Sequence, residues 1–156
     1  MAAFVQVNLN LPSFSFKTRS YNGGEQIFDP IRRRFVPLTP EEWVRQHCIN
    51  YLIQHKKVPA GLTAVEVFLA ANGVNHRADI VVYNRQGNPL VVVECKAPGV
   101  ELNSLVIDQI TRYNLYFRAK YLFITNGLKH YNFLVDWDEG RFSPLGFIPS
   151  YTEMIE

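Results

Sequence analysis

Three charged residues interrupt two of the most apolar stretches of the chain. Asp79 lies within the β-branched run 78–83, Glu94 lies near the end of a second run, 90–95, and Lys96 directly follows it. Carboxylate and ammonium groups are costly to bury unless they pair or bind a metal ion. The residue types therefore indicate either a cation-binding site or a buried ion cluster with no catalytic role.

The residues between these two runs predict a β-hairpin. They form a polar turn, 84–89, and if its two central residues make the tip, Asp79 lies directly opposite Glu94. Side chains alternate between the faces of a sheet with period two, so Lys96 shares this face, opposite Arg77. A shift of the register by one residue would separate the two acids.

A second hairpin signal brings in another acid. The Asn-Gly pair at 72–73 follows a predicted strand at 63–70, and Asn-Gly strongly favours a two-residue hairpin turn. This turn sets Glu66 opposite Asp79. Glu66 is then either a third acid of the same site or an ordinary cross-strand partner for a basic residue.

A helix is predicted from Pro40 to about residue 57. Thr39 suits the N-cap, Pro40 the first helical position, and Glu42 the acid of a capping box. Glu42 also borders the apolar stripe of this helix. Its side chain therefore either only caps the helix or points toward the sheet.

The remaining patterns complete a sheet with helices on its faces. They predict a strand at 4–11, a small hairpin at 27–36, an amphipathic helix at 103–117, an apolar strand at 121–125, and a closing hairpin of strands 130–136 and 141–148 before a frayed end. The stretch from 90 to 125 requires a parallel crossover. We expect an α/β or α+β fold with the core order helix–strand–strand–strand–helix–strand and a mixed central sheet. It forms one domain, with a β extension at 1–36, a core at 37–128, and a hairpin and tail at 129–156.

Composition constrains the partners only weakly. The 156 residues carry a net charge of +2, so any basic surface must be local. The run Arg32, Arg33 and Arg34 either contacts phosphates or is a solvated surface. Two cysteines in apolar runs, no signal peptide and no apolar run long enough to span a membrane favour a cytoplasmic location.

The charged residues of the two strands suit magnesium chemistry. Mg²⁺ sites commonly use one or two carboxylates, which Asp79 and Glu94 supply, and the main-chain carbonyl of Cys95 is a further candidate ligand. A bound Mg²⁺ polarises a phosphoryl oxygen and activates water. Lys96, protonated beside two anions, suits the role of orienting that water or neutralising charge on the phosphate.

Five segments together carry a family resemblance over about residues 27–130: 28–32 (Phe-Asp-Pro-Ile-Arg), 38–45 (Leu-Thr-Pro-Glu-Glu-Trp-Val-Arg), 77–81 (Arg-Ala-Asp-Ile-Val), 93–98 (Val-Glu-Cys-Lys-Ala-Pro) and 108–113 (Asp-Gln-Ile-Thr-Arg-Tyr). In these segments and in its element order, the chain resembles the restriction-endonuclease-like superfamily with its Asp…(Asp/Glu)-x-Lys signature. More narrowly, it resembles the N-terminal nuclease domain of type I restriction enzyme R subunits.

The resemblance implies metal-dependent cleavage of DNA phosphodiester bonds. It maps the Mg²⁺ ligands, with Mn²⁺ as a substitute, to Asp79 and Glu94, and an assisting acid of the first helix to Glu42. Gln109 then supports the site and Tyr113 contacts DNA, with Arg77 and the arginine run as further nucleic-acid-binding candidates. The implied partners are DNA and other restriction-system subunits, and a homodimer is compatible with this interpretation.

One feature of the resembling proteins is missing. Type I R subunits also carry an ATP-driven translocase, whereas this chain has no Gly-x-x-x-x-Gly-Lys-Ser/Thr phosphate loop, so no ATP site is expected. The chain is then a stand-alone relative or a module that needs partners. The alternative function is a non-catalytic nucleic-acid-binding or assembly module that retains the nuclease fold.

Overall fold

The computed structural model describes residues 6–156, which form two β-sheets and three α-helices. The antiparallel three-stranded sheet consists of β1 (Thr18–Tyr21), β2 (Gly24–Asp29) and β3 (Arg34–Pro37). The six-stranded sheet has the order β4-β5-β6-β7-β8-β9, with β4 at Thr63–Ala71, β5 at Val74–Tyr83, β6 at Pro89–Cys95, β7 at Tyr121–Thr125, β8 at His130–Asp136 and β9 at Arg141–Leu145. The helices are α1 (Pro40–Gln54), α2 (Ser104–Tyr113) and α3 (Tyr151–Ile155).

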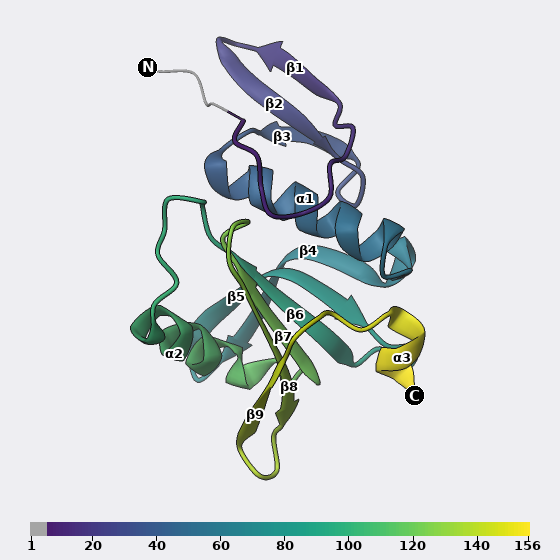
Figure 1. Ribbon diagram of the computed structural model, residues 1–156, viewed down its shortest axis with the longest axis vertical. Helices are drawn as coiled ribbons and strands as arrows, with labels where there is room; N and C mark the ends of the chain where they lie inside the picture. Colours follow the sequence, from purple (N-terminus) through teal and green to yellow (C-terminus); the bar gives the residue numbers. More distant parts are fainter. Residues whose placement is uncertain (1–5) are drawn as a thin grey trace.

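Helices cover both faces of the six-stranded sheet. One apolar cluster joins α1 and α3 to the sheet through residues such as Ile49, Met154 and Ile80, and a second joins Ile110 of α2 to Val92 on the other face. Figure 1 shows α2 and α3 on opposite sides of the sheet, with α1 between the large and the small sheet. The arrangement confirms the predicted α+β fold with a mixed sheet.

Adjacent strands pair as the turn residues predict. Ile80 pairs with Val93 and Val81 with Val92. The same register, extended by one residue, places Asp79 opposite Glu94. A bulge after Val82 changes the pairing only toward the tip. The strands β6 and β7 are parallel, as the intervening α2 requires.

The β4–β5 hairpin also has the predicted register, but it contains a kink. Val65 pairs with Ile80 and Val67 with Ala78, while Glu66 between them has a left-handed backbone with φ 54°. Val65 and Ile80 pack on the α1 face, whereas Val67 and Ala78 pack on the α2 face. The simple alternation of side chains therefore breaks at the pair Glu66 and Asp79.

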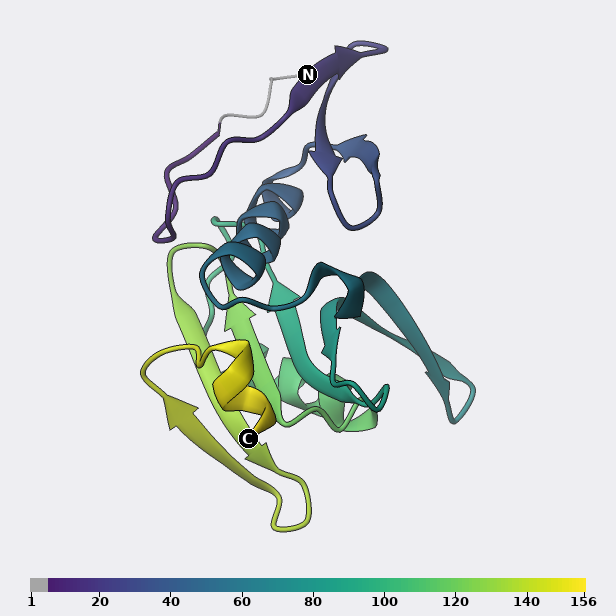
Figure 2. The same ribbon diagram turned by 90° about the vertical axis from the view of Figure 1, so that its right-hand side faces the viewer.

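Two predictions at the ends of the chain are wrong. Residues 6–11 form no strand, and positions 4 and 5 of the predicted strand lie outside the described residues. This segment instead runs beside the core, held by a 2.8 Å hydrogen bond from the Asn10 N–H to the Gly127 carbonyl. The expected frayed end is helix α3, stabilised by a capping box between Ser150 and Glu153. Figure 2 shows this helix packed against the sheet.

The first and second helices are shorter than predicted. The side chain of Thr39 accepts a hydrogen bond from the Glu42 N–H, which confirms it as the N-cap of α1, but the helix ends at Gln54. The helix α2 gives way to a 3₁₀ turn at Asn114–Tyr116. No helix among the described residues is both long and apolar enough to cross a membrane.

Candidate active site

A cleft of about 640 Å³ lies between α2 and the strands β5 and β6. It brings together six residues that the sequence predicts to act in catalysis, metal binding or DNA binding: Arg77, Asp79, Glu94, Lys96, Gln109 and Tyr113. The hairpin register supplies the first four, and the i, i+4 spacing on α2 turns Gln109 and Tyr113 to the same side. Tyr113 is 52% exposed and so forms part of the rim.

Asp79 is held rigidly at the floor of this cleft. Its side chain is buried, and its Oδ2 accepts a 2.8 Å hydrogen bond from the Cys95 N–H. Its Oδ1 accepts a 3.1 Å hydrogen bond from the guanidinium of Arg45, a residue of α1. Both contacts place a positive or partly positive group against the carboxylate and fix its orientation.

Glu94 lies in a different electrostatic environment. Burial, followed by the negative charge of Asp79, raises the pKa of Glu94 to about 9, while Lys96 acts in the opposite direction. Its Oε1 is buried and has no hydrogen-bond partner among residues 6–156. Asp79 is paired with Arg45, whereas Glu94 Oε1 has no partner, so a cation beside the two acids would offset the cost of ionising Glu94.

This donor set fits a hard divalent cation. Asp79 and Glu94 would be its side-chain ligands. Within the described residues there is no group of three or more His, Cys, Asp or Glu side chains that could hold a metal. Two carboxylates with water and substrate oxygens are typical of Mg²⁺. The Cys95 N–H is engaged with Asp79, and the role of the Cys95 carbonyl stays a prediction.

Glu42 and Glu66 do not line the cleft. The Glu42 carboxylate contacts Arg32 at 2.8 Å and Arg45 at 2.9 Å, and Glu66 contacts Arg32 at 3.3 Å and Arg45 at 3.4 Å. Both acids are therefore part of an ion network between α1, β4 and the β2–β3 turn. The sequence left two roles open for Glu42, capping alone or a side chain that points toward the sheet. Its side chain points toward this network, and only its backbone N–H takes part in capping.

Glu41 is the acid of α1 that lines the cleft. Its Oε1 lies 3.2 Å from Arg45, and burial followed by the charge of Asp79 raises its pKa. Successive helical residues point about 100° apart, so the choice between Glu41 and Glu42 depends on the rotation of the helix. In the sequence, the feature that points to Glu41 is its i, i+4 spacing to Arg45, which places the two side chains next to each other on the helix.

Arg45 is a second residue that the sequence patterns did not single out. Its side chain is 5% exposed, yet its guanidinium contacts four carboxylates, those of Glu41, Glu42, Glu66 and Asp79. This buried cation connects α1 electrostatically with Asp79 of β5. In sequence it ends the segment 38–45 that carries part of the resemblance, but no pattern there marks it as a partner of Asp79.

The three predicted phosphate-binding arginines differ in their surroundings. Arg32 binds Asp29 at 2.6 Å and has a side chain that is 12% exposed, so it belongs to the ion network. Arg33 and Arg34 are exposed. Only these two retain the accessibility that a phosphate contact needs.

Comparison with known proteins identifies a family for most of the chain. A family model described as type I restriction enzyme R protein N terminus matches residues 40–149. The match covers every residue lining the cleft and begins after the small sheet β1–β3. No curated protein sequence matches the chain.

Proposed function

The chain belongs to the family of type I restriction enzyme R protein N termini, and from this membership we propose that it is a metal-dependent DNA endonuclease or the nuclease module of a restriction system. The observation that supports this most is the pair of facing acids Asp79 and Glu94 beside Lys96 in an open cleft. The proposed substrates are DNA phosphodiester bonds. The proposed partners are DNA and other subunits of a restriction system.

Asp79 and Glu94 would hold Mg²⁺, for which Mn²⁺ is the expected substitute. The metal would polarise a phosphoryl oxygen and lower the pKa of a bound water. Asp79 is suited to this role because Arg45 and the Cys95 N–H fix its carboxylate from behind. Glu94 is suited because its proton is the one that a cation would displace at neutral pH.

Lys96 would act on the substrate. Its side chain lines the cleft beside Glu94, and its backbone N–H is fixed by a 2.8 Å hydrogen bond to the Thr125 carbonyl. An ammonium in this position neutralises charge that develops on the phosphate or orients the attacking water. Arg77 and Tyr113 at the rim would bind the DNA backbone, and Glu41 would take the assisting role that the resemblance assigns to Glu42.

A second candidate function is a nucleic-acid-binding or assembly module without catalysis. The observation that favours it is the ion pair of Arg45 with Asp79, since a guanidinium at 3.1 Å already supplies positive charge to this acid. Such a module would bind DNA in a salt-dependent manner without cleaving it.

Plasmid cleavage with Mg²⁺ or Mn²⁺ separates the two functions. We expect nicking or cleavage by the unaltered protein, reduced by a factor of about 100 or more in Asp79→Asn and in Lys96→Ala. Asp138→Asn is the matched control, because Asp138 is 97% exposed in the turn between β8 and β9. Salt-sensitive DNA binding without cleavage would support the binding module, and equal cleavage by all variants would refute the site.

A further inference from the structure

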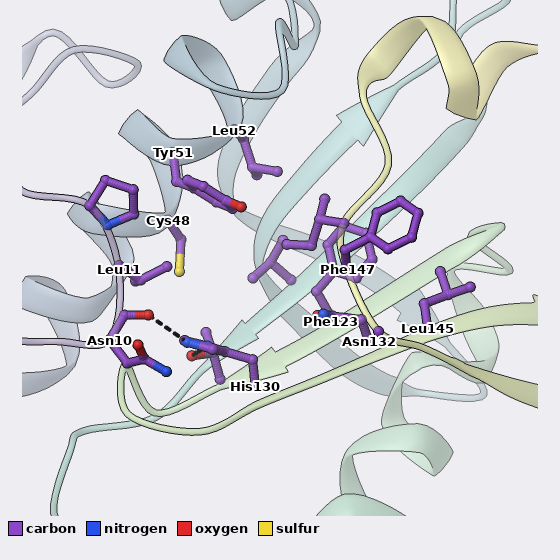
Figure 3. Close-up of a pocket in the computed structure, with 15 residues that line it drawn as sticks. Asn10, Leu11, Cys48, Tyr51, Leu52, Phe123, His130, Asn132, Leu145 and Phe147 are labelled. Carbon is purple, nitrogen blue, oxygen red and sulfur yellow. Dashed lines mark hydrogen bonds between the residues drawn. The ribbon is translucent and has the colours of Figure 1, made fainter.

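A second cavity, of about 470 Å³, lies against the strands β6 to β9. Val93 and Phe123 line it, and both belong to the apolar cluster on the α1 face, whereas the cleft is on the α2 face. The N-terminal segment, α1 and the residues after β9 complete its wall (Figure 3). The proposed DNA cleavage uses none of these residues.

The wall of this cavity is largely apolar and includes three aromatic residues. Tyr51 of α1, Phe123 of β7 and Phe147 after β9 line it from three elements, as Figure 3 shows. No lysine, arginine, aspartate or glutamate lines it in the part of the chain that the structure describes. Phe147 is 68% exposed, and such a large apolar side chain at a cavity suits a contact with a ligand better than a contact with water.

Two amides and one hydroxyl of the cavity are not engaged in hydrogen bonds among the described residues. The side chains of Asn10 and Asn132 and the hydroxyl of Tyr51 line it and make no hydrogen bond within residues 6–156. His130, by contrast, is engaged at both nitrogens, with the Asn10 carbonyl at 2.8 Å and the Thr125 hydroxyl at 2.7 Å. Each amide offers one acceptor and two donor hydrogens.

We propose that this cavity binds a neutral, planar heteroaromatic molecule of the size of a nucleoside. Ligand pockets of about 300–1,000 Å³ with aromatic walls and a few placed polar groups hold small molecules of this kind. Aromatic walls stack on a planar ring, and the two amides match the alternating donors and acceptors along the edge of a nucleobase. A charged group would be desolvated in this wall without any ion-pair partner.

The position of the cavity connects the ligand to the strands of the cleft. Thr125 lines the cavity, and its carbonyl accepts the hydrogen bond from the Lys96 N–H at 2.8 Å. Val93, another wall residue, directly precedes Glu94. A bound ligand would thus fill space directly behind the segment 93–96. The binding proposal stands without this connection and does not depend on DNA cleavage.

Direct binding to the purified full chain, without metal or DNA, tests the proposal. The probes are adenosine, guanosine, cytidine and thymidine, each followed by calorimetry and by saturation-transfer NMR. We expect at least one of them to bind with a dissociation constant below about 1 mM. Its 5′-monophosphate is expected to bind no more tightly, because the wall holds no cation for the phosphate.

Variants locate the bound probe. Asn132→Leu and Phe147→Ala are expected to weaken binding by about tenfold or more, which corresponds to the loss of one hydrogen bond to a buried group or of one stacking contact. Phe68→Ala is the matched control for Phe147, because Phe68 is 63% exposed on β4 and lies outside the cavity. Asn75→Leu, in the cleft, is the control for Asn132.

Each outcome decides the proposal. Weaker binding in the two cavity variants with unchanged binding in the two controls supports it. The absence of saturable binding by all four nucleosides overturns it, as does binding that Asn75→Leu abolishes and Asn132→Leu leaves unchanged. If a 5′-monophosphate bound more tightly than its nucleoside, the proposal that the ligand is neutral would be wrong.

Discussion

Glu94→Gln isolates the protonation of one buried acid. In the folded protein burial and Asp79 raise the pKa of Glu94 from 4.5 to about 9. At neutral pH the unfolded chain therefore carries an ionised Glu94 and the folded protein a protonated one, so that folding takes up a proton. Stability from this residue is present below pH 4.5 and is lost as the pH rises toward 9.

The magnitude follows from the size of the shift. Each pH unit between the two pKa values costs the native protein about 1.4 kcal/mol. Glutamine cannot ionise, so Glu94→Gln removes this loss while keeping the size and the hydrogen-bonding capacity of the side chain. We expect the variant to match the unaltered protein near pH 4.5 and to be more stable by about 3 kcal/mol at pH 7.

Urea unfolding followed by circular dichroism measures this difference. Titrating groups that do not interact with Glu94 are common to both proteins and cancel in the comparison. Glu139→Gln, in the exposed turn after β8, is the matched control and is expected to change stability by less than about 0.5 kcal/mol at any pH. A difference between Glu94→Gln and the unaltered protein that does not vary with pH would refute the reasoning about burial and Asp79.

A magnesium titration of the same two proteins tests the cation separately. Mg²⁺ that binds the ionised pair should stabilise the unaltered protein by about 2.7 kcal/mol at one hundred times its dissociation constant. Glu94→Gln has lost one anionic ligand and should gain much less. Equal stabilisation of both proteins would contradict Glu94 as a metal ligand while leaving the pH result intact.

Two further changes probe how the site is held. Arg45→Met removes the guanidinium shared by Asp79 and three glutamates and should lower the free energy of unfolding by about 3–5 kcal/mol. The same change at Arg118, whose side chain is 63% exposed, should have little effect. An equally small effect at Arg45 would show that the network adds no stability. Gly127→Ala places a Cβ 2.7 Å from the Leu9 side chain at a backbone φ of +85°. Its melting temperature should fall further than that of Gly73→Ala, where φ is +74° and no atom lies within 4 Å; equal losses would show that Leu9 moves aside.

Local signals predicted the arrangement of the central strands. The Asn-Gly turn set β4 against β5, the polar turn at 84–89 set β5 against β6, and both registers are confirmed. Thr39 as the N-cap was equally predictable, because a cap needs only its neighbours in sequence. The turns alone therefore determine that Asp79, Glu94 and Lys96 lie together, without any contribution from long-range packing.

Where distant segments compete, the local patterns failed. The alternation at 4–11 predicted a strand, but Leu9 and Leu11 bury their apolar side chains against the core from an irregular segment. The resemblance mapped the assisting acid of the first helix to Glu42, but the carboxylate of Glu42 contacts Arg32, ten residues earlier in the chain, and does not line the cleft. The side-chain alternation on β5 breaks at Asp79, where Glu66 of the neighbouring strand is left-handed.

Turn chemistry and apolar periodicity act over a few residues, so reading the chain was enough to identify the pairing of the strands and the acids that meet on them. The raised pKa of Glu94, the position of Glu41 at the cleft and the ion pairs of Arg45 came from packing. Burial and Coulomb interactions depend on how closely α1, β5 and β6 approach one another, and that distance exists only in the folded molecule.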